Sequence, residues 1–177
     1  MLDKLNVKPN YIVGDFDSID KEILKKYENS NIEFIRLIPE KDLTDTDSAL
    51  NLAIEKGSSK ITIIGAIGTR QDHTIANIHI LKKALEKGIE AKIINEKNEI
   101  QLINKKTYIE KDNNYKYISL IPLTTEAEGV TIKGMKYTVQ DYTFRIGESL
   151  GVSNEQIEKM AEIQIKKGIL IIIKSKD

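Results

Sequence analysis

The chain has 177 residues, with 27 basic and 27 acidic side chains, 40% apolar residues and no cysteine. Such a composition suits a globular protein and argues against a disordered chain or one that binds nucleic acid by neutralising many phosphates. Without cysteine there is no disulfide, thiolate zinc site or cysteine nucleophile. The longest apolar run, residues 169–173, is too short to span a bilayer, and the first residues lack a hydrophobic signal core. We therefore expect a cytoplasmic protein without a membrane or nucleic-acid partner.

Strand-like and helix-like segments alternate over the first half of the chain. Strands are expected at residues 11–13, 32–38, 60–67 and 90–94. A helix is expected after each of the first three strands. Thr44 and Asp47 have the spacing of a capping box, and Asp72 can cap the third helix. Gly57 and Gly88 should end the second and third helices with positive φ. This alternation predicts an α/β fold with a mainly parallel sheet and flanking helices.

The second half of the chain carries strand signals only. Strands are expected at residues 100–109, 115–123, 130–132, 137–144 and 160–173, the last of these forming a hairpin that turns at residues 167–168. Consecutive strands without helices predict a C-terminal antiparallel β-sandwich domain. We therefore expect two domains, an α/β domain over residues 1–97 and the sandwich over residues 98–177.

Five acidic residues follow the first three expected strands. They are Asp15, Asp17, Asp42, Asp45 and Asp72. The carboxyl ends of parallel strands are where ligands bind in open α/β sheets. Carboxylates gathered there repel one another unless a cation lies among them, and hard oxygen ligands suit Mg²⁺. Lys41 and Arg70 supply positive partners for phosphate, so the pattern predicts Mg²⁺-assisted phosphoryl-type transfer.

Each carboxylate also has a plain structural explanation. Aspartate favours helix N-caps and first turns, so Asp72 is equally well explained as a cap, and Asp47 fits capping better than catalysis. Asp15 and Asp17 are harder to explain in this way. Residues two apart in an extended segment face the same side, which would direct both carboxylates at one ligand.

Two loops carry weaker signals. The Gly-Ala-Ile-Gly-Thr-Arg segment at residues 65–70 lacks the Gly-Lys-Ser/Thr of a P-loop. Residues 147–154 contain several small hydrogen-bonding groups, which fit either a connection between strands or contacts to a polar ligand. Taken alone, this segment is better explained as a connection.

Four ordered motifs together resemble the thiamine pyrophosphokinase family over nearly the whole chain. They are residues 14–18 (Gly-Asp-Phe-Asp-Ser), 41–45 (Lys-Asp-Leu-Thr-Asp), 65–73 (Gly-Ala-Ile-Gly-Thr-Arg-Gln-Asp-His) and 149–155 (Ser-Leu-Gly-Val-Ser-Asn-Glu). The resemblance implies a homodimer with active sites at the subunit interface. It also implies transfer of pyrophosphate from ATP to the hydroxyl of thiamine, which gives thiamine diphosphate and AMP.

The resemblance also implies roles for individual residues. The Mg²⁺ and catalytic site would use Asp15, Asp17 and Asp45, with Arg70 neutralising charge that develops during transfer. Nucleotide and phosphate contacts would come from Lys41, Asp42, Thr44, Arg70 and Asp72. The loop that meets thiamine would contribute Ser149, Ser153 and Asn154.

One departure from the family pattern keeps two alternatives open. Members of the family normally begin with a further strand and an Ala-Asp-Gly-Gly-like segment, whereas this chain starts ten residues before Tyr11. We therefore expect an N-terminally truncated catalytic domain. A truncated relative could bind thiamine or its diphosphate without turnover, and a carboxylate cluster would equally suit a Mg²⁺-dependent phosphohydrolase.

Overall fold

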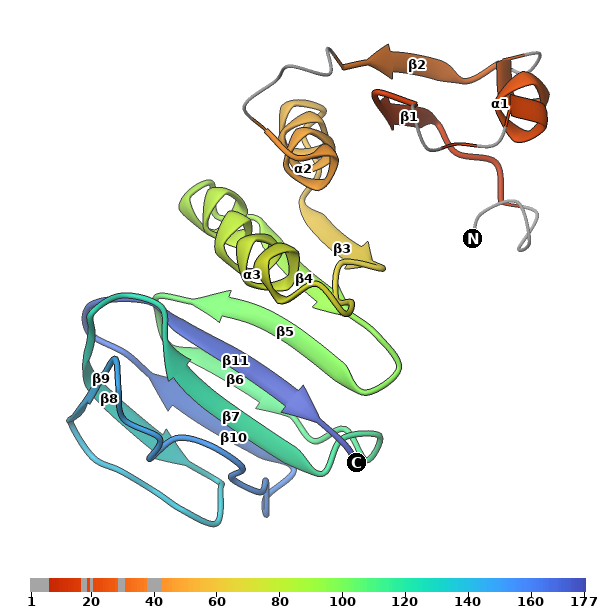
Figure 1. Cartoon of the computed structure of the whole chain (residues 1–177). Coiled ribbons are helices and arrows are strands. Elements are labelled where there is room, and N and C mark those ends of the chain that lie inside the picture. Colours follow the sequence, from red (N-terminus) through yellow and green to blue (C-terminus); the bar gives the residue numbers. More distant parts are fainter. Residues whose placement is uncertain (1–6, 17–18, 20, 29–30, 38–42) are drawn as a thin grey trace. The chain divides into compact units, whose positions relative to one another are not determined.

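The computed structural model describes residues 7–16, 19, 21–28, 31–37 and 43–177 (Figure 1). The chain divides into two compact units, Met1–Lys56 and Gly57–Asp177. None of the described helices combines the length and the apolar character needed to cross a membrane.

The first unit contains a parallel pair of short strands and two helices. Strand β1 (Tyr11–Gly14) pairs in parallel with β2 (Glu33–Arg36), and helix α1 (Lys21–Glu28) connects them along the chain. Helix α2 (Asp45–Glu55) contacts β1. The expected strands at 11–13 and 32–38 are confirmed, the second with shorter bounds.

Helix α2 begins and ends as its sequence predicts. The Thr44 hydroxyl accepts a hydrogen bond from the backbone N–H of Asp47 at 3.2 Å, which satisfies a donor that the first turn leaves without a helical partner. The helix ends at Lys56, and Gly57 follows with φ 76°. Both the capping interaction and the glycine stop are confirmed.

A sheet of five strands forms one half of the second unit. Its order is β3–β4–β5–β11–β7, with bounds Lys60–Ile64, Glu90–Ile94, Asn98–Ile103, Leu170–Ser175 and Tyr117–Pro122. Only β3 and β4 are parallel here, and the other three pairings are antiparallel.

The expectation of a mainly parallel sheet is not confirmed, because the sheets are largely antiparallel. The physical reason lies in the turn after β4. The Asn95 side-chain oxygen accepts hydrogen bonds from the backbone N–H groups of Lys97 and Asn98, which closes a tight turn. A connection this short can only return the chain antiparallel.

The second sheet has the order β6–β10–β8–β9 and is antiparallel throughout. Its strands are Thr107–Glu110, Met160–Gln164, Glu126–Lys133 and Tyr142–Arg145. One buried apolar cluster draws side chains from both sheets, including Leu120 and Ile172 from the first and Ile132, Phe144 and Ile163 from the second. The two sheets therefore share a core, as in a sandwich.

The predicted hairpin over residues 160–173 is wrong, although both of its strands exist. Strand β10 pairs with β6 and β8, whereas β11 pairs with β5 and β7 in the other sheet. The segment between them instead runs beside β8, where Lys167 bridges to Glu128. Alternating apolar residues specify which side of a strand is buried, but they do not specify its neighbour.

Helix α3 (Gln71–Glu86) covers the face of the five-stranded sheet opposite the sandwich core (Figure 1). It contacts β4 and β5 and buries Leu81 and Ala84, while Ile93 and Ile100 are buried in the strands. Gly88 follows the helix with φ 71°, as predicted. The sheet continues from β4 to β5 across the expected domain boundary at residues 97–98.

Candidate functional site

The end of β1 brings together two of the predicted site residues. A carboxylate oxygen of Asp45, at the start of α2, lies 3.5 Å from the position that a Cβ on Gly14 would take. Gly14 is the last residue of β1, and Asp15 follows it directly. The Asp45 carboxylate thus lies at the strand end from which Asp15 extends.

The backbone at Phe16 does not have the extended conformation on which the pairing of Asp15 and Asp17 at one ligand depends. Its φ is 65°, in the left-handed region, so the segment is not extended at this point. This conformation costs a residue other than glycine roughly 1–3 kcal/mol and tends to occur at functional sites. The Phe16 ring packs edge-on against Phe34 at 5.7 Å, and the Arg36 guanidinium lies 5.2 Å from its centroid.

Three of the predicted phosphate-site residues lie outside the described residues. They are Asp17, Lys41 and Asp42. Within the part of the chain that the structure describes, no three acidic or histidine side chains gather as metal ligands. The predicted set of Asp15, Asp17 and Asp45 is therefore incomplete here. The two carboxylates at the end of β1 are nevertheless the hard oxygen donors that Mg²⁺ prefers.

The loop between β3 and α3 is held by side chains of the helix that follows it. Asn77, which is 6% exposed, donates a hydrogen bond of 2.8 Å to the carbonyl oxygen of Ala66. The Thr74 hydroxyl accepts from the backbone N–H of Gly68 and donates to the carbonyl oxygen of Arg70. The loop therefore keeps a defined course into the first turn of α3.

Arg70 and Asp72 form an exposed ion pair at the start of α3. The Arg70 guanidinium donates from Nη2 at 2.6 Å and from Nε at 3.3 Å to the two Asp72 carboxylate oxygens. These bonds, with a smaller contribution from the His73 backbone N–H, lower the pKa of Asp72 to about 2. The predicted cap at Asp72 is wrong, because the N-cap position is Arg70 and Asp72 lies inside the first turn.

The segment of residues 149–154, referred to below as the β7 loop, runs along the edge of β7. Ile118 and Asn154 exchange backbone hydrogen bonds of 2.8 and 3.1 Å, and the N–H of Leu120 donates to the carbonyl oxygen of Gly151 at 2.8 Å. A Cβ on Gly151 would overlap the carbonyl oxygen of Leu120, so the close approach requires glycine. The backbone hydrogen bonds to β7 therefore hold the loop in position without a bound ligand.

Ser153 and Asn154 have different surroundings within this loop. Ser153 is exposed with φ 59°, and its N–H donates to the hydroxyl of the buried Ser119 at 3.0 Å. Asn154 is 5% exposed, and its amide bonds both the N–H (3.0 Å) and the carbonyl (2.6 Å) of Tyr137. Ser149 and Ser153 can thus offer hydroxyls to a ligand, whereas the Asn154 side chain holds the loop.

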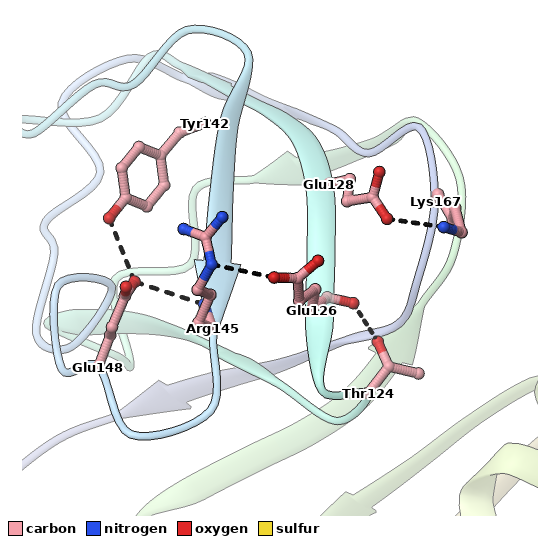
Figure 2. A network of polar contacts seen from close by, with 7 residues as sticks. All are labelled: Thr124, Glu126, Glu128, Tyr142, Arg145, Glu148 and Lys167. Atoms are coloured by element: carbon pink, nitrogen blue, oxygen red, sulfur yellow. Dashed lines mark hydrogen bonds and ion pairs between the residues drawn. The ribbon is translucent and has the colours of Figure 1, made fainter.

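Polar contacts fix the residues that lead into the β7 loop (Figure 2). One oxygen of the exposed Glu148 carboxylate accepts from the Tyr142 hydroxyl at 3.1 Å and from the Arg145 backbone N–H at 3.4 Å. The Arg145 guanidinium donates to Glu126 at 3.0 Å (Figure 2). The hydrogen bond to Glu148 is the main reason that the pKa of Tyr142 is raised above its ordinary value.

Sequence reasoning missed the residues that support the β7 loop, namely Ser119, Tyr137, Tyr142, Arg145 and Glu148. Ser119 and Ser153 are 34 positions apart, and Tyr137 and Asn154 are 17 positions apart, which local spacing does not reveal. The contacts of Glu148 with Tyr142 and Arg145 span only six and three positions, but no capping or turn pattern indicates them. The available signal was a single serine inside an otherwise apolar strand.

Comparison with known proteins gives matches over both halves of the chain. The family model described as Thiamin pyrophosphokinase, catalytic domain, matches residues 1–93, and the model for its vitamin B1 binding domain matches residues 106–170. The thiamine pyrophosphokinase of Bacillus subtilis is 38% identical over 165 residues, which covers 93% of this chain and 77% of the relative.

Solved structures agree with this match. The crystal structure of the Bacillus subtilis thiamine pyrophosphokinase has a TM-score of 0.92 at 35% identity, covering 99% of this chain and 83% of that one. The structure of a thiamin pyrophosphokinase from Geobacillus thermodenitrificans has a TM-score of 0.89 at 29% identity, covering 99% and 81% of the two chains. The chain belongs to the thiamin pyrophosphokinase family.

Proposed function

We propose that this chain transfers the pyrophosphoryl group of ATP to the hydroxyl of thiamine. The observation that carries the proposal is the 38% identity with a Bacillus subtilis relative named thiamine pyrophosphokinase. The thiamine hydroxyl oxygen forms a bond to the β-phosphorus, and the bond from that phosphorus to the bridging oxygen of the α-phosphate breaks. AMP leaves with that oxygen, and the hydroxyl proton passes to a base.

The end of β1 supplies the phosphate-handling groups in this proposal. Asp15, Asp17 and Asp45 would hold Mg²⁺, and Lys41, Asp42 and Thr44 would line the same site. The bound metal supplies charge neutralisation on the ATP phosphates. The strained backbone at Phe16 fixes the direction in which the chain leaves Asp15, so the carboxylate needs little reorganisation on binding.

Arg70 would stabilise negative charge that grows on the transferred group. Asp72 occupies its Nε and Nη2 donors, which leaves the Nη1 hydrogens for a phosphate oxygen. Because the pKa of Asp72 is about 2, its carboxylate stays ionised at neutral pH and keeps the guanidinium oriented.

The β7 loop would receive thiamine. Ser149 and Ser153 are exposed hydroxyls on a segment whose backbone is bonded to β7. Asn154 contributes by holding Tyr137 and, through the backbone, the left-handed turn at Ser153. We assign the phosphate chemistry to residues 1–97 and thiamine recognition to residues 98–177.

We further propose a homodimer in which the β7 loop completes the partner's site. Ile146, Leu150 and Val152 are 63%, 59% and 49% exposed along this stretch, and a second copy of the chain could cover them. Mixing Asp45→Asn subunits with Ser153→Ala subunits should then restore activity, because a mixed dimer contains one unaltered site. Subunit exchange without any recovery would place the whole site in one chain.

Product analysis with ATP, Mg²⁺ and thiamine tests the proposed reaction. We expect AMP and thiamine diphosphate in equal amounts. ADP with thiamine monophosphate would contradict pyrophosphoryl transfer, and phosphate release without thiamine would indicate a phosphohydrolase. Thiamine binding without AMP release would indicate a binding protein. The comparisons favour neither of the last two alternatives.

A further inference from the structure

A cavity of about 290 Å³ opens beside the turn between β6 and β7. Lysines and a tyrosine line much of it, namely Lys111, Tyr115, Lys116 and Lys174, together with the acidic Asp112 and Glu155. None of the predicted site residues lines this cavity. Its lining therefore takes no part in the proposed pyrophosphoryl transfer.

The wall of the cavity at Lys174 carries excess positive charge. Glu99 accepts hydrogen bonds from two ammonium groups, Lys92 at 2.7 Å on one oxygen and Lys174 at 2.8 Å on the other. The side chains of Lys92, Lys174 and Glu99 are only 22%, 14% and 11% exposed. Burial raises the pKa of Glu99, but these two hydrogen bonds outweigh it and leave the pKa below its ordinary value. One carboxylate thus serves two largely buried cations.

The remaining charged groups do not remove this excess. Glu155 is paired with Lys136 at 3.0 Å, and the Lys116 ammonium lies 4.8 Å from the centre of the Tyr117 ring. Among the charged side chains that line the cavity, Lys111, Lys116 and Lys174 are cations, and Asp112 and Glu155 are carboxylates. The lining cations outnumber the lining carboxylates by one.

Two donors at the cavity are not used within the described structure. The Lys111 ammonium and the Tyr115 hydroxyl each have no hydrogen-bond or ion-pair partner among the residues that are described. Burial, followed by the charges of Glu99 and Asp112, raises the pKa of Tyr115. The phenol therefore stays protonated at neutral pH and can donate a hydrogen bond.

We propose that this cavity binds a small phosphate-bearing anion, with Lys111, Lys116 and the Tyr115 hydroxyl as its donors. An ammonium and a hydroxyl suit the oxygens of a tetrahedral dianion, and hydrogen bonds to a charged acceptor are the stronger kind. The volume accommodates a phosphate group with part of its hydration shell. The excess positive charge disfavours thiamine, which is itself a cation.

Amide chemical shifts of the full-length protein test this proposal. Titration with inorganic phosphate, and separately with methyl phosphate, should give saturable shifts at residues 111–116 and 155–156, against sodium chloride of equal ionic strength. Lys111→Gln should weaken binding about tenfold, since it removes one charge-assisted bond. Tyr115→Phe, which keeps the ring, should weaken binding severalfold.

Lys105→Gln is the matched control, because Lys105 is exposed and does not line this cavity. It should leave the affinity within twofold. Tighter binding of methyl phosphate would identify the ligand as a phosphate monoester, and tighter binding of inorganic phosphate would identify the free ion. Shifts that match those from chloride, or equal affinities for Lys111→Gln and Lys105→Gln, would overturn the proposal. Neither result depends on whether the chain transfers pyrophosphate to thiamine.

Discussion

Arg70 holds the Asp72 carboxylate with two of its donors, Nη2 at 2.6 Å and Nε at 3.3 Å, although both side chains are more than 60% exposed. Two parallel bonds from a planar guanidinium fix an orientation that a single contact would not. The Arg70 guanidinium at the start of α3 therefore has a defined orientation.

The first prediction concerns the titration of this pair. An NMR titration of the Asp72 side-chain carboxyl should show a midpoint near the pKa of about 2, and Arg70→Gln should return it towards the ordinary 3.8. Because the folded-state pKa is the lower one, the pair contributes stability above about pH 4 and loses it as the pH falls towards 2. An unchanged midpoint in Arg70→Gln would show that Arg70 is not the cause.

The second prediction concerns Asp45. Asp45→Asn should reduce Mg²⁺-dependent turnover by about a hundredfold or more, since it removes a charged ligand from the proposed metal site. The melting temperature should not fall, because relieving repulsion between neighbouring carboxylates rarely destabilises. Glu55→Gln, an exposed change in the same helix, is the control. Near-normal turnover in Asp45→Asn would remove this residue from the site.

The third prediction separates stability from binding at Asn154. Asn154→Ala removes a buried amide and the two hydrogen bonds that it makes with the backbone of the exposed Tyr137, so it should cost about 1–3 kcal/mol in the free energy of unfolding. Asn104→Ala, at an exposed position, should cost less than about 0.5 kcal/mol. Urea denaturation measures both. An Asn154→Ala protein of normal stability would contradict the structural role.

The fourth prediction compares two glycines with nearly equal φ. Gly88 (71°) has open space where a Cβ would lie, whereas at Gly134 (75°) the carbonyl oxygen of Met160 would lie 2.7 Å away. Gly88→Ala should therefore lower the free energy of unfolding by about 1 kcal/mol, which is the cost of placing alanine at positive φ. Gly134→Ala should lower it by about 2 kcal/mol more, because the backbone around Met160 must shift to make room for the Cβ. Equal costs in chemical denaturation would show that the carbonyl moves freely.

The fifth prediction concerns the support of the β7 loop. Tyr142→Phe removes the hydroxyl that donates to Glu148 and should raise the KM for thiamine about fivefold with little change in kcat, since the loop loses a fixed anchor. Tyr108→Phe, at a residue that is 58% exposed in β6, is the control. A fall in kcat with unchanged KM would instead connect Tyr142 to the chemical step.

Local interactions were predictable from the sequence and long-range ones were not. Thr44 caps the backbone three residues ahead, and Gly57 and Gly88 end their helices, because these features depend only on neighbouring residues. Asp72 is a local exception: its helix begins two residues earlier than expected, and its carboxylate is bonded to Arg70.

Strand partners and the geometry of the candidate site show the same limit. Apolar alternation located β10 and β11 but not the sheets to which they belong. At Phe16, the left-handed backbone depends on packing with Phe34 and Arg36, so an extended spacing could not be assumed there. Ser119, which supports the β7 loop, lies in a strand 34 positions before its partner Ser153, and no motif encodes that contact.

The hydrogen bonding between β4 and β5 means that the two halves of this chain cannot be separated at residues 97–98 without breaking a sheet. The two family-model matches end and begin at residues 93 and 106, on either side of strand β5. Dividing the chain between these matches would leave the backbone N–H and C=O groups of β4 and β5 without their strand partners. Exposed strand edges of this kind promote aggregation. A substitution in either half near this boundary must therefore keep the shared hydrogen-bond ladder in register.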